Sequence, residues 1–398
     1  MKDIDSDSRS SKSRWTLWVV LAVCLLIPTT SRADLFSTEK LELFADFRAR
    51  AEADWDSEDG DGDERDDRNR LRIRVRVGAQ YKPNEHVSFV VRLRTGSDDS
   101  QQSPHITILD FDDNSTGDVH VNPDKWYLEG KTKHLWSWVG RNGLPFWKQN
   151  ELYWDDDVTP AGLAGGFKTG LGENHGLALN AGFVSNPAGM QDFVGNMWLG
   201  QIVYSAKIGE GGLKAAVGSL TMEGEDEADF PAVALFQTGN GSRNYEIWIG
   251  SLQGKIPLGG RKLTLGADVL HNAEDYSNVD PGLPSDDPEQ ITFDNRDETD
   301  GHVLSILYGG GKEKGDWLAG YYYAHIETLA VNASYAQDDW VRWGSSTQTR
   351  GSNMEGHELR FVYNVARRSN LVARLYIVEA VNGPEDGNRF RLDFNHKL

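Results

Sequence analysis

Residues 70–77 read Arg-Leu-Arg-Ile-Arg-Val-Arg-Val, an uninterrupted alternation of cationic and aliphatic side chains. Successive side chains of a β-strand point to opposite faces, whereas an α-helix repeats about every 3.6 residues and would spread both kinds of side chain around its circumference. The segment is therefore predicted to be a strand with one apolar face and one arginine face.

The two flanking segments show the same period of two. Residues 41–53 place leucine, phenylalanine and alanine at the odd positions and charged residues at most of the even ones. After the turn sequence Lys-Pro-Asn-Glu at 82–85, residues 89–94 again set apolar side chains against arginine. Three adjacent antiparallel strands are predicted here.

Strand-like segments of about 10–15 residues recur to the C-terminus and are joined alternately by short and long connections, as in membrane β-barrels. The short connections are interpreted as periplasmic turns: residues 82–85, 130–133, 170–174, 207–212, 257–261, 311–315 and 367–370. The long connections are interpreted as extracellular loops: residues 55–67, 98–120, 142–161, 185–193, 223–242, 273–300, 328–355 and 382–387. Seven hairpins and one further strand at each terminus give sixteen strands, with both termini periplasmic. Residues 160–169 and 339–343 fit least well, and a hairpin at 339–343 would give eighteen strands.

The charge and the hydropathy pattern of the chain exclude several classes of protein. The formal net charge is −20, which makes nucleic acid an improbable partner. No segment beyond the N-terminal region stays apolar for the roughly 18 residues that a spanning helix needs, but a membrane barrel turns only every second residue to lipid. A soluble β-sandwich rarely needs this length or so regularly charged a second face. We therefore expect an all-β fold, a transmembrane antiparallel β-barrel of about 16 strands, with 18 as the alternative.

The C-terminal segment and the aromatic residues agree with a barrel. Residues 389–398 place Phe390, Leu392 and Phe394 on one face and charged or polar side chains on the other. Barrel-assembly machinery reads such a terminal strand, although its last residue is usually aromatic and here is Leu398. The thirteen tryptophans and thirteen tyrosines include several near predicted strand ends, as in the aromatic girdles of outer-membrane barrels.

The N-terminus has the order of regions found in secretory signal peptides. Basic residues precede the apolar run 15–28, and Ser31 and Ala33 lie where signal peptidase requires small residues. Residues 1–33 are predicted to be a cleaved signal peptide, which leaves residues 34–398 as one barrel domain in the bacterial outer membrane. The single cysteine, Cys24, would be removed with the signal, so that disulfides and thiol chemistry are excluded from the barrel.

The arginines of the first three strands are the first candidate site. An arginine facing the bilayer midplane costs about 2–4 kcal/mol, so these side chains are expected to face the lumen, where they would bind and pass anions. A structural lattice of ion pairs, with Asp46, Glu52 and Asp54 as partners, is an equally weighted alternative. The predicted pore-lining residues are Arg48, Arg50, Arg70, Arg72, Arg74, Arg76, Arg92 and Arg94.

The long connection 142–161 is the second candidate site. Folded inward, its carboxylates would face the arginines and form a constriction with a transverse field, while its aromatic side chains would offer a sliding surface for sugar rings. Folded outward, it would be only a solvated lid. The predicted constriction residues are Glu151, Trp154, Asp155, Asp156 and Asp157.

No catalytic, cofactor or metal site is predicted. The acidic run 56–64 could share a calcium ion, but Glu64 stands where an EF-hand needs glycine and Arg70 where it needs glutamate. The sequence contains neither Gly-x-Ser-x-Gly nor His-Glu-x-x-His, and His325 and His357 are interpreted as structural strand residues.

Several segments taken together resemble the bacterial putative-porin family. They are the arginine alternation at 70–77, Arg-Leu-Arg-Thr-Gly-Ser at 92–97, Val-Gly-Arg at 139–141 leading to Leu-Pro-Phe-Trp at 144–147, Leu-Tyr-Trp-Asp-Asp-Asp at 152–157, and Gly-His-Glu-Leu at 356–359. The resemblance extends from about residue 41 to residue 398 and implies an outer-membrane channel without established catalytic residues.

The sequence thus predicts a porin that lets small hydrophilic solutes diffuse passively, with a preference for anions or sugars. The alternatives are a lipid- or peptide-hydrolysing barrel enzyme and a plugged structural barrel, which sixteen strands make too wide. The expected partners are outer-membrane lipid and lipopolysaccharide, the barrel-assembly machinery, small solutes and, by analogy with porins, two further copies in a homotrimer.

Overall fold

The structure is a computed structural model that describes residues 37–38, 40–112, 114–224, 244–277, 295–340 and 351–398. The predicted signal peptide, residues 1–33, lies outside this part of the chain. Within the described ranges no helix is long and apolar enough to cross a membrane.

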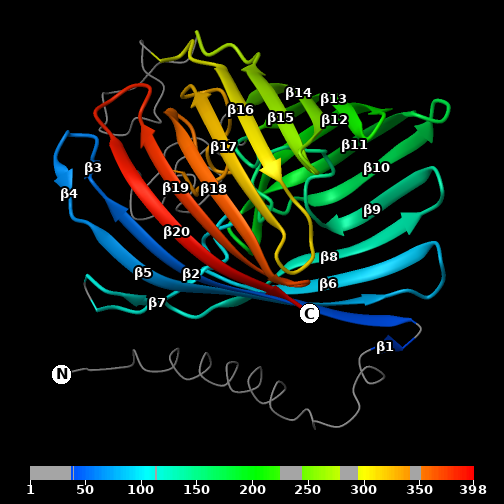
Figure 1. Ribbon diagram of the computed structural model, residues 1–398, viewed down its shortest axis with the longest axis horizontal. Coiled ribbons are helices and arrows are strands. Elements are labelled where there is room, and N and C mark those ends of the chain that lie inside the picture. The colour runs from blue at the N-terminus through cyan, green and yellow to red at the C-terminus, as the bar shows by residue number, and fades with distance from the viewer. Residues whose placement is uncertain (1–36, 39, 113, 225–243, 278–294, 341–350) are drawn as a thin grey trace, which may run out of the picture.

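Sixteen long strands of the described chain form one closed antiparallel barrel (Figure 1). Each strand pairs with its neighbours in the chain, and β20 pairs with β2 to close the ring. The expected number of sixteen is therefore confirmed. The strands are β2 (Leu41–Trp55), β5 (Arg68–Tyr81), β6 (Val87–Thr95), β8 (Val121–Lys131), β9 (Leu135–Arg141), β10 (Ala161–Gly170), β11 (His175–Ala188), β12 (Asp192–Ile208), β13 (Gly211–Glu223), β14 (Tyr245–Leu258), β15 (Arg261–Asn272), β16 (Asp300–Gly309), β17 (Trp317–Ile326), β18 (Met354–Ala366), β19 (Ser369–Glu379) and β20 (Asp386–Lys397).

Four short strands lie outside this ring. β1 (Ser37–Thr38) pairs with the start of β2, and β7 (Ile106–Asp110) pairs with β5 beyond the end of β6. β3 (Ser57–Glu58) and β4 (Glu64–Arg65) form a separate hairpin within the first long loop.

The seven predicted short turns all join adjacent strands at one end of the barrel. Two expectations about the strands need correction. Residues 185–193 are not a long loop, because β11 and β12 stay paired out to Ala188 and Asp192. Asp339 and Trp340 belong to a loop and form no strand, while residues 341–343 lie outside the described part of the chain.

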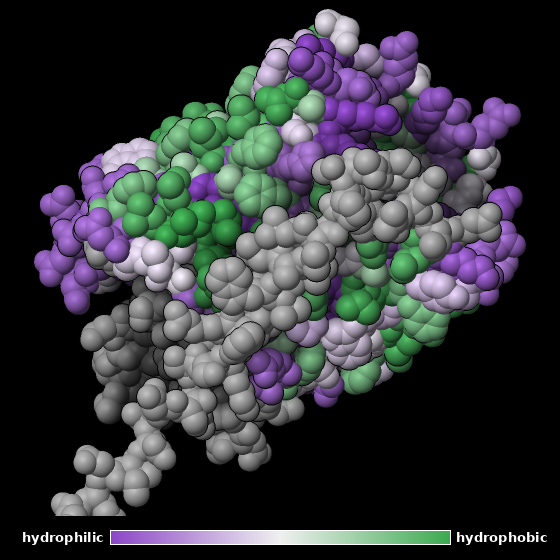
Figure 2. Space-filling view, turned by 90° about the horizontal axis from the view of Figure 1, so that it is seen from below, coloured by the Kyte–Doolittle hydropathy of each residue, from purple (hydrophilic) through white to green (hydrophobic). Residues whose placement is uncertain are grey.

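The outer face of the barrel is apolar, as the alternation predicts. Large aliphatic side chains such as Val139, Leu163 and Ile202 are more than half exposed, at 53, 57 and 56%. Figure 2 shows apolar side chains gathered over the strands, with hydrophilic residues toward the ends. A soluble protein rarely exposes so extended an apolar surface, whereas lipid requires it.

An apolar core lies inside the barrel near the strand ends that carry the long loops. Met222, Tyr245 and Met354 are buried there at the ends of their strands, together with Trp154 and Tyr335 from loops. The loops are therefore packed against the inner wall, and they form the site described next.

Candidate functional site

The arginines that the sequence pattern singled out lie on the inner face of three adjacent strands, β2, β5 and β6. The strand register places Arg48 and Arg50 of β2 opposite Arg74 and Arg72 of β5. It also places Arg76 of β5 opposite Arg94 of β6. Aliphatic residues occupy the alternate positions and face outward. We call this set the arginine wall: Arg48, Arg50, Arg70, Arg72, Arg74, Arg76, Arg92 and Arg94.

Most guanidinium groups of the arginine wall are paired with carboxylates. Arg50 Nε donates to Asp393 Oδ1 at 2.7 Å. Asp46 accepts from Arg74 at 3.0 Å and from Arg76 at 2.8 Å. Much of the wall's positive charge is therefore compensated by an ion-pair lattice. Its further pairs are Arg70–Glu52, Arg92–Asp124 and Arg68–Asp54.

Three members of the arginine wall have no carboxylate within hydrogen-bond distance among the described residues. Arg94 donates instead to the backbone carbonyls of Ser100 at 2.6 Å and Asp157 at 3.2 Å. Arg48 Nε donates to the amide oxygen of Asn395 at 2.7 Å, and its nearest carboxylate, Asp393, is 3.8 Å away. Arg72 lies 3.8 Å from Glu52. These three cations are the members of the wall whose charge is least compensated by a carboxylate.

The basic inner face is wider than the sequence analysis expected. Arg360, Arg374, Arg389 and Arg391 extend it across β18, β19 and β20. Arg391 Nε donates to Glu52 of β2 at 2.6 Å across the closing strand pair. The alternation in residues 389–395 signals this inward face, but only barrel closure brings it beside β2.

Residues 142–160, the connection between β9 and β10, cross the interior of the barrel. At one end of the loop, Asp157 Oδ1 accepts from Arg76 at 2.7 Å and its other oxygen lies 3.6 Å from Arg74. Near its middle, Gln149 and Asn150 donate to Asp268 of β15 at 3.0 and 2.6 Å. The loop is thus anchored to both sides of the barrel.

Of the loop's aromatic side chains, which were expected to offer a sliding surface for sugars, Trp154 cannot contribute to it. Its side chain is fully buried and stacks on Tyr335, with ring centroids 5.1 Å apart. Asp155 is also buried, and its Oδ1 accepts the backbone amide of Asp157 at 2.6 Å. Of the five predicted constriction residues, Glu151, Asp155, Asp156 and Asp157 lie at the cavity described below.

A second inward segment, residues 327–340 between β17 and β18, was not foreseen from the sequence. The backbone carbonyl of Tyr335 accepts the backbone N–H of Asp155 at 2.7 Å, and Gln337 donates its backbone N–H to the backbone carbonyl of Glu151 at 3.1 Å. Gln101 of a third loop donates to Ser334 at 2.7 Å. Small and apolar residues at 329–336 could have signalled burial, since a solvated loop rarely carries so many.

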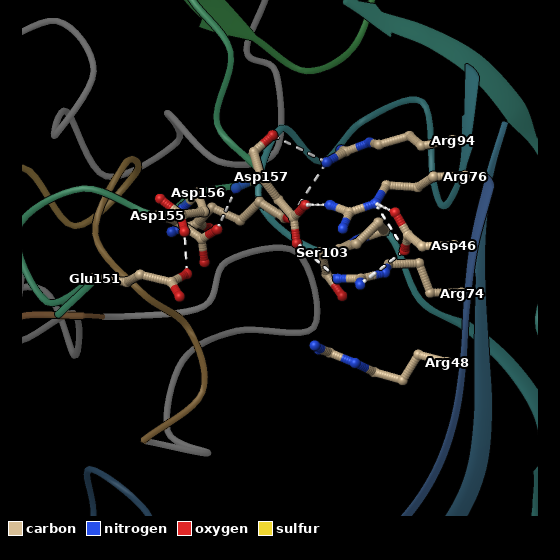
Figure 3. Close-up of polar contacts among 12 residues, drawn as sticks. Asp46, Arg48, Arg74, Arg76, Arg94, Ser103, Glu151, Asp155, Asp156 and Asp157 are labelled. Carbon is tan, nitrogen blue, oxygen red and sulfur yellow. Dashed lines mark hydrogen bonds and ion pairs between the residues drawn. The ribbon is translucent and has the colours of Figure 1, made fainter. Parts of the chain in front are cut away.

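The loops and the walls enclose a cavity of about 340 Å³. The arginine wall lines one side of it, with Arg48, Arg74 and Arg76, while Glu151 and Asp156 line the other. Figure 3 shows these arginines extending from the strands toward the carboxylates of the loop. Charges of opposite sign therefore face one another across a solute-sized space.

The loop carboxyls fall into two electrostatic classes. Burial by itself would raise the pKa of Asp157 and of Asp339, but the charges of Arg76 and Arg391, respectively, outweigh it and hold both pKa values far below the ordinary range. Burial raises the pKa of Glu151 and of Asp155, and neighbouring carboxylates raise it further. The first class stays ionised on acidification, whereas the second takes up protons early.

This division predicts a pH effect on the charge of the cavity. Because the pKa values of Glu151 and Asp155 are raised, both should become neutral on acidification before an ordinary carboxyl of pKa about 4 does, while the arginines stay charged. Anion-over-cation permeability, obtained from reversal potentials in a salt gradient, should therefore rise. The double variant Glu151→Gln, Asp155→Asn should show a smaller change, and an acid-induced change toward cations would contradict the assignment.

The histidines and the acidic first loop form no comparable site. His325 Nδ1 lies 2.9 Å from Glu355, and His357 Nδ1 lies 2.9 Å from the hydroxyl of Tyr321. Asp59 Oδ1 in the acidic loop accepts two backbone amides. In the described ranges no cluster of three or more histidine, cysteine or acidic side chains is arranged to hold a metal ion.

Comparisons with known proteins relate both the sequence and the fold of this chain to porins. The sequence model of the family described as "Putative porin" matches residues 61–184. The fold is similar to OprB of Pseudomonas putida, with a TM-score of 0.54 at 11% identity over 90% of this chain and 94% of that chain. It is also similar to OmpF of Salmonella typhi, solved with daunomycin, with a TM-score of 0.51 at 8% identity over 90 and 97%. A search of curated proteins gives no significant match. The chain therefore carries the putative-porin sequence pattern over residues 61–184 on the fold of an outer-membrane porin.

Proposed function

We propose that the protein is a passive, non-enzymatic porin of the outer membrane, through which small hydrophilic solutes diffuse between the arginine wall and the loop of residues 142–160. One observation carries this proposal. The loop crosses the barrel and meets the wall at Asp157, leaving beside the contact a cavity of about 340 Å³ lined mainly by charged side chains. Such a lining favours solutes that are hydrophilic or charged.

The preference for anions rests on fewer arginines than the wall contains. Five of the eight arginines are paired with carboxylates, so Arg48, Arg72 and the buried Arg94 are left to attract anions, and of these Arg48 lines the cavity. A weak anion preference follows. The sugar preference stays a prediction that Trp154 does not support, because its ring is buried, whereas Trp147 of the same loop lines a second cavity.

A plugged structural barrel is the second candidate, favoured by the mutual hydrogen bonds of the three inward loops. The homotrimer and the contacts with lipopolysaccharide, lipid and assembly machinery stay predictions. Crosslinking in isolated outer membranes, followed by denaturing electrophoresis, would test the trimer.

Single-channel recording in a planar bilayer tests the channel directly. The folded protein should give stable conductance steps, and the variant with Arg72, Arg74 and Arg76 changed to Ala should favour cations more strongly. One unit charge at 4 Å in water contributes about 1 kcal/mol, so a shift of roughly fivefold in the permeability ratio is expected. Changing the exposed turn residues Arg367 and Arg368 to Ala is the matched control. A folded barrel that never conducts would support the plugged alternative.

A further inference from the structure

One cation at the cavity is only weakly compensated. The carboxylate nearest to Arg48 in the described part of the chain, Asp393, lies 3.8 Å away and is already bonded to Arg50 through two contacts of 2.7 and 3.1 Å. Arg48 keeps a single side-chain hydrogen bond, from its Nε to Asn395. Its terminal amino groups lie at the cavity lining, and Figure 3 shows them directed away from the strands.

Two anions on the loop side are also without a cation. Glu151 and Asp338 line the same cavity. Glu151 Oε2 accepts the backbone amide of Asp156, and among the described residues neither carboxylate forms an ion pair. By contrast, the neighbouring Asp156 is paired with Lys148 at 2.8 Å.

Most of the other charges at the cavity are already satisfied. Asp157 and Asp46 hold Arg74 and Arg76, and Asp339 lies 3.1 Å from Arg374. Asp155 is buried and accepts the backbone amide of Asp157, and Lys397 is an exposed residue at the end of β20. The groups deeper in the cavity that are still available to a solute are therefore one guanidinium on the wall and two carboxylates on the loops.

We propose that the cavity selects zwitterions of amino-acid size, with the solute carboxylate at Arg48 and its ammonium at Glu151 and Asp338. This inference rests on the proposed diffusion of solutes through the barrel. A simple anion drawn to Arg48 would meet two uncompensated carboxylates, and a simple cation would meet Arg48. A neutral solute would gain from neither charge, whereas a dipolar solute of suitable length gains from both. The cavity volume of about 340 Å³ lies in the lower part of the range found for small-molecule binding sites.

The test compares three solutes with the same number of heavy atoms. Proteoliposomes containing the full chain would be placed in isotonic alanine, lactamide or lactate at pH 7.5, and swelling would be recorded after subtraction of protein-free liposomes. Alanine is the zwitterion, lactamide the neutral reference and lactate the anion. Alanine should enter roughly threefold faster than lactamide, the effect of a partly screened ion pair, and also faster than lactate.

A charge can be removed and restored after folding. In a Cys24→Ser background the chain has no cysteine, so Arg48→Cys introduces a unique thiol. This variant should lose the preference of alanine over lactamide. An aminoethyl methanethiosulfonate reagent, which adds a cation, should restore it, and a methyl reagent should not. Arg367→Cys, at an exposed turn, serves as the modification control.

The acidic side is tested by Glu151→Gln with Asp338→Asn, which should also abolish the preference, while Glu313→Gln in a periplasmic turn should not. Equal entry of alanine and lactamide, unchanged by modification at position 48, would overturn the zwitterion inference and leave the porin intact. Failure of all three solutes to enter through a folded barrel would overturn the proposed function and the inference with it.

Discussion

Replacement of Asp339 by asparagine is expected to lower the free energy of unfolding by about 3–5 kcal/mol, the cost of removing one partner from a buried ion pair. Asp339 contacts Arg391, lies 3.1 Å from Arg374 and 3.5 Å from Arg50. All four side chains are largely shielded from solvent. The change would leave three guanidinium groups facing one another without this shared anion.

The same variant should also conduct more strongly. Asp339 is the ionic attachment of the segment 327–340 to β2, β19 and β20, and that segment hydrogen-bonds to residues 142–160. Loss of the attachment would let both loops move away from the wall. Urea unfolding monitored by tryptophan fluorescence and bilayer conductance would measure the two effects on one preparation.

The matched control is Asp338→Asn, one position earlier. Asp338 forms no ion pair within the described ranges, and burial, followed by the charge of Asp339, raises its pKa. Its replacement should change stability by less than about 0.5 kcal/mol, as most substitutions do where no specific interaction is lost. Equal destabilisation by the two variants would show that Asp339 is not the anchor.

Replacement of Asp157 by asparagine is expected to have the second-largest effect, and mainly on selectivity. The change removes the anion that Arg76 and Arg74 share at the crossing point of the loop. Asp46 still holds both arginines, so the barrel should keep its fold. Their freed charge should raise the chloride-to-potassium permeability ratio by roughly fivefold, corresponding to about 1 kcal/mol for one unit charge at 4 Å in water.

Reversal potentials of the wild type and the Asp157→Asn variant in a tenfold gradient of potassium chloride would measure this shift. Asp156→Asn makes the same formal change one residue away, but this side chain is 68% exposed and paired with Lys148. Its effect should be smaller because solvent screens an exposed charge. An Asp157 variant that becomes more selective for cations would contradict the assigned contact.

The strands, their faces and the seven short turns could be predicted from the sequence, whereas the predicted long connection 185–193 proved to be paired strand. Period-two alternation is a local property, because each residue's side chain is turned to one face by the backbone of its own strand. The inward position of Arg72 and Arg74, the seven short turns and the count of sixteen could therefore be read without knowledge of any long-range contact. The expected lipid environment showed which face of each strand lies inside the barrel, because arginine is unfavourable on the outer face.

Only the tertiary structure decided how the interior is filled. Glu52 and Arg391 are 339 positions apart, and they meet because the last strand closes on the first. The inward course of residues 327–340 and the burial of Trp154 depend on contacts between loops that lack any repeating pattern. Loop conformation is determined by which distant partners satisfy its backbone and charged groups. Periodicity contains no information about those partners, so the anchors at Asp157 and Asp339 became visible only in the folded barrel.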